Sequence, residues 1–252
     1  MPKPKIKVAI VQPFDVVGSI QRRTLMVASA LREHNGFEFI FIVPKNGFLF
    51  TKVALTKRFK VYKTSSLRPF PPSSARGLFH LLKVIKSIPK SMVEFYKILK
   101  RERPDVIQLN GFICIQEAIV TAIVARKRFI WNLIGNLYPR FLIMLLSPLI
   151  RTAKIRVFVS YSLRSYYLGT HNDVIIREYV DTSLFNRGNV DRRVVNCLRK
   201  ILKIEEDAPV LLSVGNISPV KGYEFLIESL TYLRKVFPNL SLIHISEPTR
   251  PY

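Results

Sequence analysis

The chain has 252 residues, of which 48% are hydrophobic and 23% are charged. This composition is typical of a globular protein and excludes wholesale disorder as well as collagen-like or mucin-like structure. Lys and Arg number 40 against 17 Asp and Glu, which gives a formal net charge of +23. Such an excess favours anionic partners, namely nucleic acid, anionic lipid or phosphorylated substrates.

The cysteine content and the lengths of the apolar runs indicate the cellular compartment of the protein. Cys114 and Cys197 cannot build a disulfide framework, and they fit a reducing compartment; no metal-ligand spacing accompanies them, so we predict no metal site. The run Val8–Val11 is too short for the core of a secretory signal, and the longest apolar block, Phe141–Leu146, falls far below the ~20 residues that span a bilayer. We expect a cytoplasmic protein, either free in solution or peripheral on the inner face of the cytoplasmic membrane.

Short β-branched runs alternate with amphipathic stretches along the chain. Strands are predicted at residues 6–11, 37–43, 105–109, 129–133, 155–160, 174–176 and 210–214. Helices are predicted at residues 20–33, 78–100, 115–126, 138–150, 162–168, 192–202 and 223–236. Apolar strands that alternate with helices indicate a parallel sheet covered on both faces, with ligands bound at the carboxyl ends of its strands.

The domain organisation follows from the point at which this pattern is interrupted. Residues 186–207 are polar and charged, and a new strand follows them, so we predict a linker there. Residues 1–185 are expected to form an N-terminal α/β domain with a doubly wound, Rossmann-like parallel sheet. Residues 208–239 are expected to begin a second Rossmann-like domain.

The C-terminal tail has a different origin in our interpretation. Residues 240–250 read Leu-Ser-Leu-Ile-His-Ile-Ser-Glu-Pro-Thr-Arg, which matches the translation of a transposase-type sequencing adapter, and Pro251 fits the codon that follows. We therefore predict that residues 240–252 are an adapter artefact without a function, so that His244 and Glu247 have no catalytic role. The parent protein is then expected to continue beyond Asn239.

The strongest local motif lies after the strand predicted at 210–214. A loop that contains Gly215 and Gly222 leads into a helix, and Lys221 stands where the loop becomes the helix. A helix N-terminus offers free amide groups and a partial positive charge, and a lysine adds a full one, which suits a phosphate group. From spacing alone, the alternative is an exposed lysine before an ordinary helix.

This motif resembles the start of the second domain in family-four glycosyltransferases of the GT-B fold, whose signature reads approximately V-G-R-x-x-x-x-K-G. Lys221 matches the family lysine that clamps the donor diphosphate, while Asn216 replaces the family arginine. Residues 174–185 are similar to the element V-I-P-N-G-V-D-x-x-x-F: Val180, Asp181 and Phe185 match, whereas Arg177, Glu178 and Tyr179 replace Pro, Asn and Gly.

Two further segments of the N-terminal half carry the resemblance. The loop after the first strand is similar to one that holds a Gly-Gly pair, with Gly18 kept and Ser19 in the second place. The segment 104–110 resembles P-D-V-I-H-x-H, with Gln108 and Asn110 in place of the two histidines. The resemblance covers residues 6–239, and it implies a partial GT-B fold.

The resemblance also implies a function. It implies a retaining glycosyltransferase that moves a sugar from a nucleotide-sugar donor to an acceptor, and a lipid-linked acceptor is one option. It implies no obligatory metal or cofactor. The carboxylate motif that holds the donor ribose in the family would follow Asn239, so we expect this chain to be inactive by itself. The implied donor phosphate site consists of Gly215, Asn216, Lys221 and Gly222.

Further candidate residues lie at predicted strand ends. Gly18 and Ser19 form the cleft loop, and Asn110, Asn136 and Glu178 are candidates for contacts with the acceptor or the sugar. The alternative for each asparagine is a loop side chain that bonds its own backbone, and for Glu178 it is an ion pair with a neighbour of Arg177.

Lys and Arg crowd residues 52–103, where only Glu94 and Glu102 oppose them. Lys83, Lys86, Lys90 and Lys97 share one face of the helix predicted there, and Pro89 is expected to split or kink it. One interpretation is an amphipathic helix with a solvated face. The other is a surface that docks on anionic lipid, which the resemblance to enzymes with lipid-linked acceptors favours.

Two other functions stay open at this point. A non-catalytic glycosyltransferase-like scaffold is favoured by the missing histidines and by Asn216. Nucleic-acid binding is prompted by the net charge of +23, but no sequence pattern of a known nucleic-acid-binding module supports it.

Overall fold

The computed structural model describes residues 5–12, 15, 18–33, 36–45, 49–65, 77–111, 115–121, 128–134, 139–215, 217 and 219–246. Within these ranges the side chains of residues 49, 77–87, 115, 116, 142 and 220 stay outside the description. The chain divides into two compact units, Met1–Glu178 (unit 1) and Tyr179–Tyr252 (unit 2). The predicted linker 186–207 contains a short 3-10 turn, Arg187–Asn189, and helix α7, Arg192–Ile201.

Unit 1 is built on a 7-stranded sheet in the order β3-β2-β1-β4-β5-β6-β7, in which every pair of neighbours is parallel. This order confirms the predicted doubly wound α/β sheet. Strand β3 was not predicted, because a short edge strand that contains Lys60 and Lys63 lacks the apolar run that marks the central strands. The strands are β1 (Ile6–Val11), β2 (Phe37–Pro44), β3 (Lys60–Thr64), β4 (Val106–Asn110), β5 (Phe129–Leu133), β6 (Ile155–Phe158) and β7 (Asp173–Ile175).

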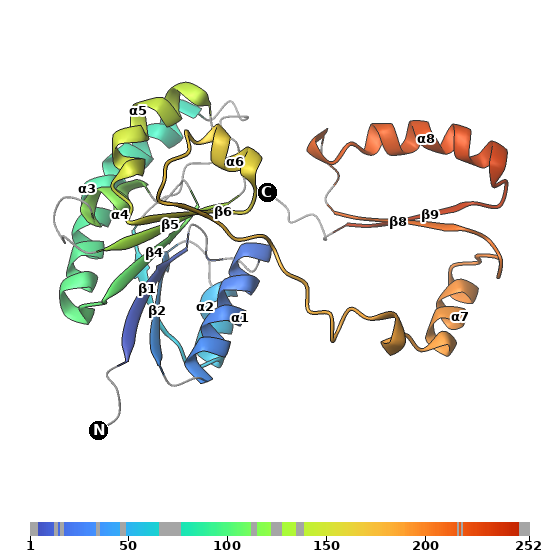
Figure 1. Cartoon of the computed structure of the whole chain (residues 1–252), viewed down its shortest axis with the longest axis horizontal. Helices are drawn as coiled ribbons and strands as arrows, with labels where there is room; N and C mark the ends of the chain where they lie inside the picture. The colour runs from blue at the N-terminus through green and yellow to red at the C-terminus, as the bar shows by residue number, and fades with distance from the viewer. Residues whose placement is uncertain are drawn as a thin grey trace. The chain divides into compact units, whose positions relative to one another are not determined.

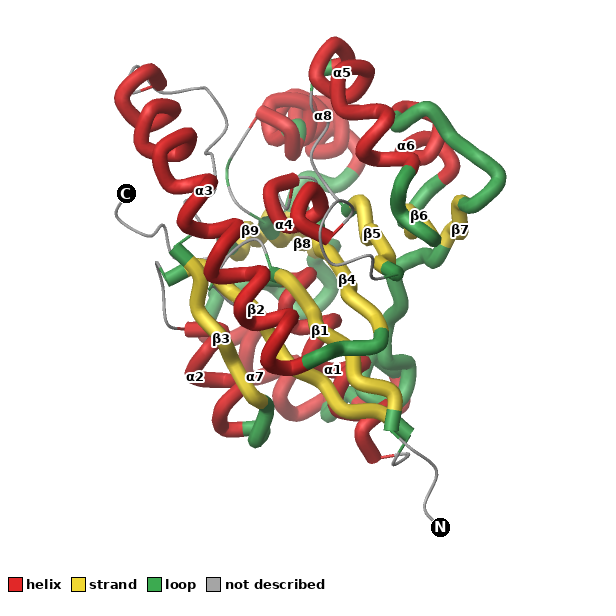
Figure 2. The backbone as a smooth tube through the Cα atoms, turned by 90° about the vertical axis from the view of Figure 1, so that its left-hand side faces the viewer, coloured by secondary structure: helices red, strands yellow, loops and turns green. Residues whose placement is uncertain are grey.

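Helices cover both faces of this sheet (Figures 1 and 2). Helices α1 and α2 pack on one face around an aromatic cluster of Phe41, Phe50 and Phe59. The other helices bury their apolar side chains against Trp131 and its neighbours on the opposite face. The helices are α1 (Ser19–Glu33), α2 (Leu49–Thr56), α3 (Gly77–Glu102), α4 (Ile115–Val120), α5 (Arg140–Arg151) and α6 (Tyr161–Tyr166).

Helix α3 corrects one expectation. It runs unbroken from Gly77 to Glu102 with Pro89 inside it, so Pro89 does not divide the segment into two helices. Phe95 and Leu99 anchor its second half in the core, where they are 0% and 4% exposed. We attribute the continuity to this packing, because Pro89 itself is exposed and its ring needs no space in the core.

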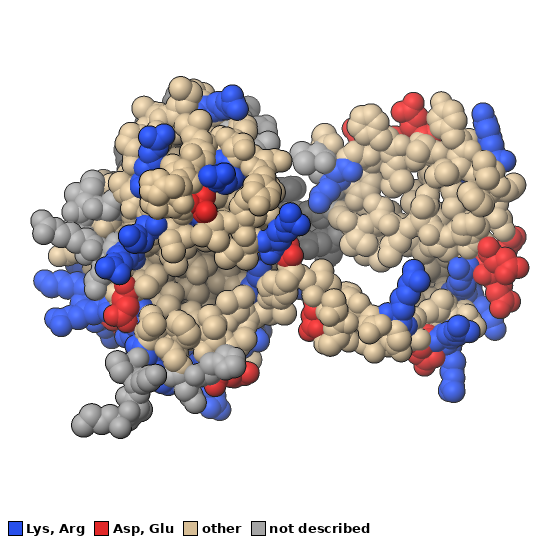
Figure 3. Space-filling model, viewed as in Figure 1, with Lys and Arg blue, Asp and Glu red and all other residues tan. Residues whose placement is uncertain are grey.

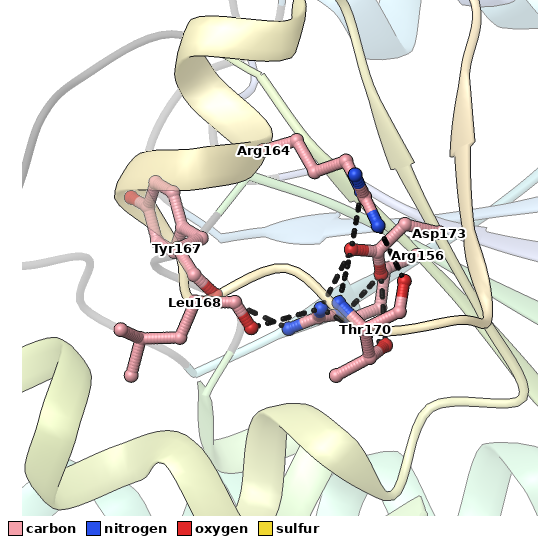
Figure 4. A network of polar contacts seen from close by, with 6 residues as sticks. All are labelled: Arg156, Arg164, Tyr167, Leu168, Thr170 and Asp173. Atoms are coloured by element: carbon pink, nitrogen blue, oxygen red, sulfur yellow. Dashed lines mark hydrogen bonds and ion pairs between the residues drawn. The ribbon is translucent and has the colours of Figure 1, made fainter.

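A buried ion pair ties β6 to β7 (Figure 4). Arg156 on β6 is 2% exposed and donates from Nε and Nη2 to the two carboxylate oxygens of Asp173, over 2.7 and 2.8 Å. Arg164 on α6 and both the backbone and the hydroxyl of Thr170 donate to the same carboxylate. Arg156 also donates to the backbone oxygens of Tyr167 and Leu168. The network therefore locks the connection between α6 and β7.

Unit 2 contains a 2-stranded parallel sheet of β8 (Val210–Val214) and β9 (Ser241–Ile245), connected by α8 (Tyr223–Val236). Strand β9 lies within the tail that we interpret as an adapter sequence. The composition of that segment favours a strand whatever its origin, because it contains Leu242, Ile243 and Ile245.

Candidate functional site

The strand order places a topological switch point between β1 and β4. The chain runs outward from β1 through β2 to β3 and then returns to pair β4 with the other side of β1. In doubly wound sheets, ligands bind in the crevice outside the carboxyl ends of the strands at this point. The residues that end β1 and β4 are therefore the first candidates for a binding site in unit 1.

Three amide side chains line up across the carboxyl ends of β1, β4 and β5. Asn110 and Asn132 are register partners on β4 and β5. Gln12 follows Val11, whose partner is Leu109, so Gln12 lies at the level of Asn110. Side chains alternate between the faces of a strand, and Gln12 shares the α1 face with Ile10.

Hydrogen bonds connect this amide row to helix α1. The Nδ2 of Asn132 and the Nε2 of Gln108 both donate to the Oδ1 of Asn110, over 3.2 and 2.9 Å. The Nδ2 of Asn110 donates to the Oγ1 of Thr24 on α1 over 3.4 Å. Asn110 is 0% exposed, so this predicted candidate is a buried member of a hydrogen-bonded network.

The row has unused hydrogen-bonding capacity. Gln12 is 0% exposed, and within the described part of the chain neither its Oε1 nor its Nε2 has a partner; the same holds for the Oδ1 of Asn132. A buried polar group left without a partner costs about 1–3 kcal/mol. Native structures usually complete such groups with a water molecule or a ligand. An amide offers both a donor and an acceptor, which matches a hydroxyl group.

A buried carboxylate, that of Asp15, lies between β1 and α1 in the sequence. Asp15 is 2% exposed and accepts from the backbone and the hydroxyl of Thr51 over 2.8 and 2.6 Å, with Lys63 at 3.3 Å. It therefore joins the loop after β1 to the first turn of α2. Gly18 and Ser19, the predicted cleft loop, lie at the start of α1, where the backbone N–H of Gly18 donates to Gln21.

Glu178 forms an ion pair with α1. The Nη1 of Arg23 donates to its Oε1 over 2.5 Å, and the Arg23 side chain is 15% exposed against 57% for Glu178. The partner of Glu178 is thus Arg23 on α1, which is distant in sequence from the neighbours of Arg177 that were expected to pair with it. Asn136, the remaining acceptor candidate, lies outside the described residues.

In unit 2 the described residues of the predicted phosphate motif lie between β8 and α8, where Pro219–Lys221 form a 3-10 turn. Gly215 has φ +151°, and a Cβ placed there would lie 3.6 Å from the Cε of Lys221, so the lysine stem passes close over Gly215. Gly222 is the N-cap of α8 with φ 65° and ψ 35°, a left-handed conformation that favours glycine. Lys221 is exposed beside the free amides of α8. Asn216 lies outside the described residues.

The same turn is braced from α8 and β9. The hydroxyl of Tyr223 donates to the backbone oxygen of Gly215 over 3.0 Å. The Nε2 of His244 lies 2.9 Å from that oxygen and 3.0 Å from the Tyr223 hydroxyl. His244 therefore supports the loop conformation, a packing role that needs no catalytic function.

Sequence reasoning missed Gln12, Asn132 and Asp15 as possible site residues. Gln12 and Asn132 carried a usable signal, because a polar residue inside or directly after an apolar strand must find buried partners. Among the described residues no group of His, Cys, Asp and Glu could hold a metal ion. No helix in the described ranges is long and apolar enough to cross a membrane.

Comparison with known proteins places this geometry in context. No known protein family matches the chain. A stretch of 51 residues is 43% identical to lipopolysaccharide 1,2-N-acetylglucosaminetransferase of Salmonella typhimurium, which covers 20% of this chain and 13% of that protein. The similarity in sequence is therefore confined to a small part of both chains.

Solved structures are similar over nearly the whole chain. HepE of Anabaena, crystallised in complex with UDP and glucose, superimposes with a TM-score of 0.66 and 16% identity over 95% of this chain and 60% of HepE. Sucrose-phosphate synthase of Thermosynechococcus elongatus gives a TM-score of 0.66 and 13% identity over 98% of this chain and 64% of the synthase. This chain thus spans less than two thirds of either protein. At such identities the likeness shows the fold alone, which is a partial GT-B fold.

Proposed function

We propose that the chain comprises the acceptor-side domain and the start of the donor-binding domain of a retaining glycosyltransferase related to family four. It would transfer a sugar from a nucleotide-sugar donor to an acceptor, with a lipid-linked glycan as one acceptor class, and without an obligatory metal or cofactor. The observation that carries the proposal is the turn of Gly215, Lys221 and Gly222 at the N-terminus of α8. The similarity to a structure crystallised with UDP and glucose supports it.

The chemistry rests on charge stabilisation. When a sugar leaves a nucleotide diphosphate, negative charge grows on the departing phosphate oxygens. The Lys221 ammonium and the free amides of α8 would stabilise that charge from fixed positions, which is the largest contribution in many transfer reactions. Gly215 and Gly222 allow the diphosphate to approach the backbone, with Asn216 as a further contact.

The acceptor would bind at the amide row of unit 1. Gln12 and Asn132 hold unused hydrogen-bonding groups, and Asn110 orients the row through Thr24. Sugar hydroxyls suit these amides because each hydroxyl both donates and accepts. Gly18 and Ser19 would place the start of α1 beside the acceptor, and Asn136 is a further candidate for a contact with the acceptor. Glu178 contributes through its ion pair with Arg23.

Calorimetric titration of the full-length parent protein with UDP tests the donor site. Lys221→Ala should weaken UDP binding by about 13–160-fold, the equivalent of 1.5–3 kcal/mol for a charge-assisted hydrogen bond. Lys200→Ala, which removes an exposed lysine at the end of α7, is the matched control and should bind as the parent chain does. If the Lys221 variant and the parent bind UDP with equal affinity, Lys221 is an ordinary exposed lysine without a role in the donor site.

A second experiment tests whether the chain by itself catalyses sugar transfer. Unit 2 of this chain has a sheet of only 2 strands among its described residues, so we expect no transfer of sugar from UDP-sugars by the chain alone. Robust turnover in a product-release assay would show that the donor site is complete without further sheet.

A non-catalytic scaffold is the second candidate. The amide row consists of Gln12, Asn110 and Asn132, and Gln108 bonds to it; none of these side chains titrates, so the row can bind hydroxyls but cannot move a proton. A parent protein that binds UDP and acceptor without turnover would favour the scaffold. Binding of nucleic acid ranks below both, since it rests on net charge alone.

We also propose that unit 1 lies on an anionic membrane surface through the lysine face of α3. Lys90 and Lys97 are exposed, and neither pairs with an acid among the described residues; the side chains of Lys83 and Lys86 lie outside the description. The acids of this helix are occupied, because Glu94 pairs with Lys45 and Glu102 with Lys7. Lys and Arg gather at the edge of unit 1 where Figure 1 draws α3 (Figure 3).

A further inference from the structure

Helix α5 is apolar on two opposite faces. Ile143 and Ile150 point into the core and are 1% exposed each. Phe141, Met144 and Leu145 lie on the other side and are 72%, 64% and 73% exposed. At 3.6 residues per turn these three side chains form one continuous stripe, which Pro148 extends. A helix that is apolar all round normally has a second apolar environment to contact.

The charge around this outer stripe has a single sign. Arg140 and Arg151 lie along one flank of the stripe, and Lys154 follows the helix; all three are exposed, and none pairs with an acid in the described ranges. The sequence contains no Asp or Glu between Glu117 and Asp173. Arg140 lies over the ring of Tyr166, 5.7 Å from its centroid, which keeps the cation beside the stripe.

A planar anionic surface fits this arrangement better than another protein. Protein interfaces usually pair cations with acids of the partner at specific points, whereas lipid headgroups accept a cation anywhere along the flank. Helix α5 has 12 residues, too few to span a bilayer but enough to lie in the interface. Helices α3 and α5 belong to the same layer over one face of the sheet (Figure 2), so one plane can contact both.

We infer that α5 inserts Phe141, Met144 and Leu145 into the headgroup region of an anionic bilayer, while Arg140 and Arg151 contact the lipid phosphates. The inference deepens the membrane association proposed for α3 and rests on it. It is independent of the sugar-transfer reaction. Helix α3 supplies the long-range electrostatic attraction, and α5 supplies an apolar contact that salt cannot screen.

Vesicle co-sedimentation across a salt series separates these two contributions. The probe is a vesicle of phosphatidylcholine with phosphatidylglycerol, and pure phosphatidylcholine vesicles are the control. At 1 M salt the Debye length is about 3 Å, so binding that persists there is apolar. The variant Phe141→Ser/Met144→Ser/Leu145→Ser should lose this salt-resistant binding by more than tenfold, about 1.4 kcal/mol. Lys90→Gln/Lys97→Gln should lose only the salt-sensitive part.

Matched controls make the outcome specific. The variant Phe225→Ser/Ile227→Ser/Val236→Ser removes side chains of α8 that are 74%, 62% and 69% exposed, and it should bind vesicles as the parent does. If all binding disappears with salt and depends on Lys90 and Lys97, α3 docks and the inference for α5 is wrong. Equal loss in the α5 and α8 variants overturns it too, as does a dimer in sedimentation velocity that the α5 variant abolishes.

A second measurement avoids any dependence on a triple variant that fails to fold. Leu145→Trp places a reporter on the exposed stripe, and its emission is read as the difference from the parent chain, whose Trp131 is 0% exposed. With the anionic vesicles the added emission should shift to the blue and resist quenching by acrylamide. An unchanged, fully quenchable emission at saturating vesicle concentration would refute insertion.

Discussion

Replacement of Asp173 by asparagine should destabilise unit 1 strongly, because it removes the charge that compensates buried Arg156. The Asp173 side chain is 0% exposed and accepts 5 hydrogen bonds: two from Arg156, one from Arg164 and two from Thr170. Asparagine keeps the shape but loses the charge and one acceptor oxygen. Arg156 would then be a buried cation without a counterion.

The expected cost follows from the burial of both partners. Removal of one member of a buried ion pair costs about 3–5 kcal/mol. Arg156 keeps its bonds to the Tyr167 and Leu168 carbonyls, and Arg164, whose side chain is 37% exposed, can turn to water. We therefore expect the lower end, about 3 kcal/mol. For a unit of this size that corresponds to a fall in Tm of roughly 6–12 °C.

Urea denaturation followed by circular dichroism measures this loss. Glu33→Gln, which neutralises an exposed carboxylate at the end of α1, is the control and should stay within about 0.5 kcal/mol of the parent. The variant Arg156→Met/Asp173→Asn should lose less than the sum of its single changes, because it contains no uncompensated charge. A loss below about 1 kcal/mol for Asp173→Asn would refute the reasoning, since it would class the network with exposed pairs.

The pH dependence of the same variant supplies a sign test. Burial alone would raise the pKa of Asp173, but the hydrogen bonds from Arg156 and Thr170 outweigh it and hold the pKa below its ordinary value of 3.8. A lowered folded-state pKa means that the stabilisation is complete above 3.8 and is lost as the pH falls through the folded-state pKa. The difference in stability between the parent and Asp173→Asn should therefore shrink on acidification below that value.

Two further changes test other parts of unit 1. Glu102→Gln should lower the free energy of unfolding by about 1.5–3 kcal/mol in urea denaturation, because Glu102 loses its charge opposite Lys7 and the hydrogen bond from Tyr62 is weakened. The hydrogen bond from Tyr62 holds the pKa of Glu102 below its ordinary value of 4.5, so this loss of stability should fade as the pH falls below 4.5. A loss that does not depend on pH would contradict this account. Gln12→Leu should leave the free energy of unfolding unchanged or raise it by about 1–3 kcal/mol, since it removes a buried amide that has no partner within the described residues. Acceptor binding by the parent protein should fall. A destabilised Gln12→Leu variant with normal acceptor binding would show that the amide serves the fold.

The sequence by itself determined the fold class of unit 1 and the location of most elements. Strand β1 was predicted with its observed bounds, and so were β5, β8 and α8. Periodicity succeeds at these places because burial of a strand on both faces requires an unbroken apolar run, which is a local property. The same local rules missed β3, where pairing with β2 outweighed local preference. Pro89 does not split α3, where packing of the second half outweighed local preference, while the alternative that Pro89 kinks the helix stays a prediction.

The candidate site was only partly accessible from sequence, for a physical reason. The glycines and the lysine of the turn after β8 form a contiguous motif, so chain order alone brought them together. The amide row joins Gln12, Asn110 and Asn132, which are distant in sequence, and it exists because β4 pairs with β1 on one side and with β5 on the other. Register between parallel strands is set by packing across the whole sheet, so which polar residues meet, and which remain without a partner, was decided only by the tertiary structure.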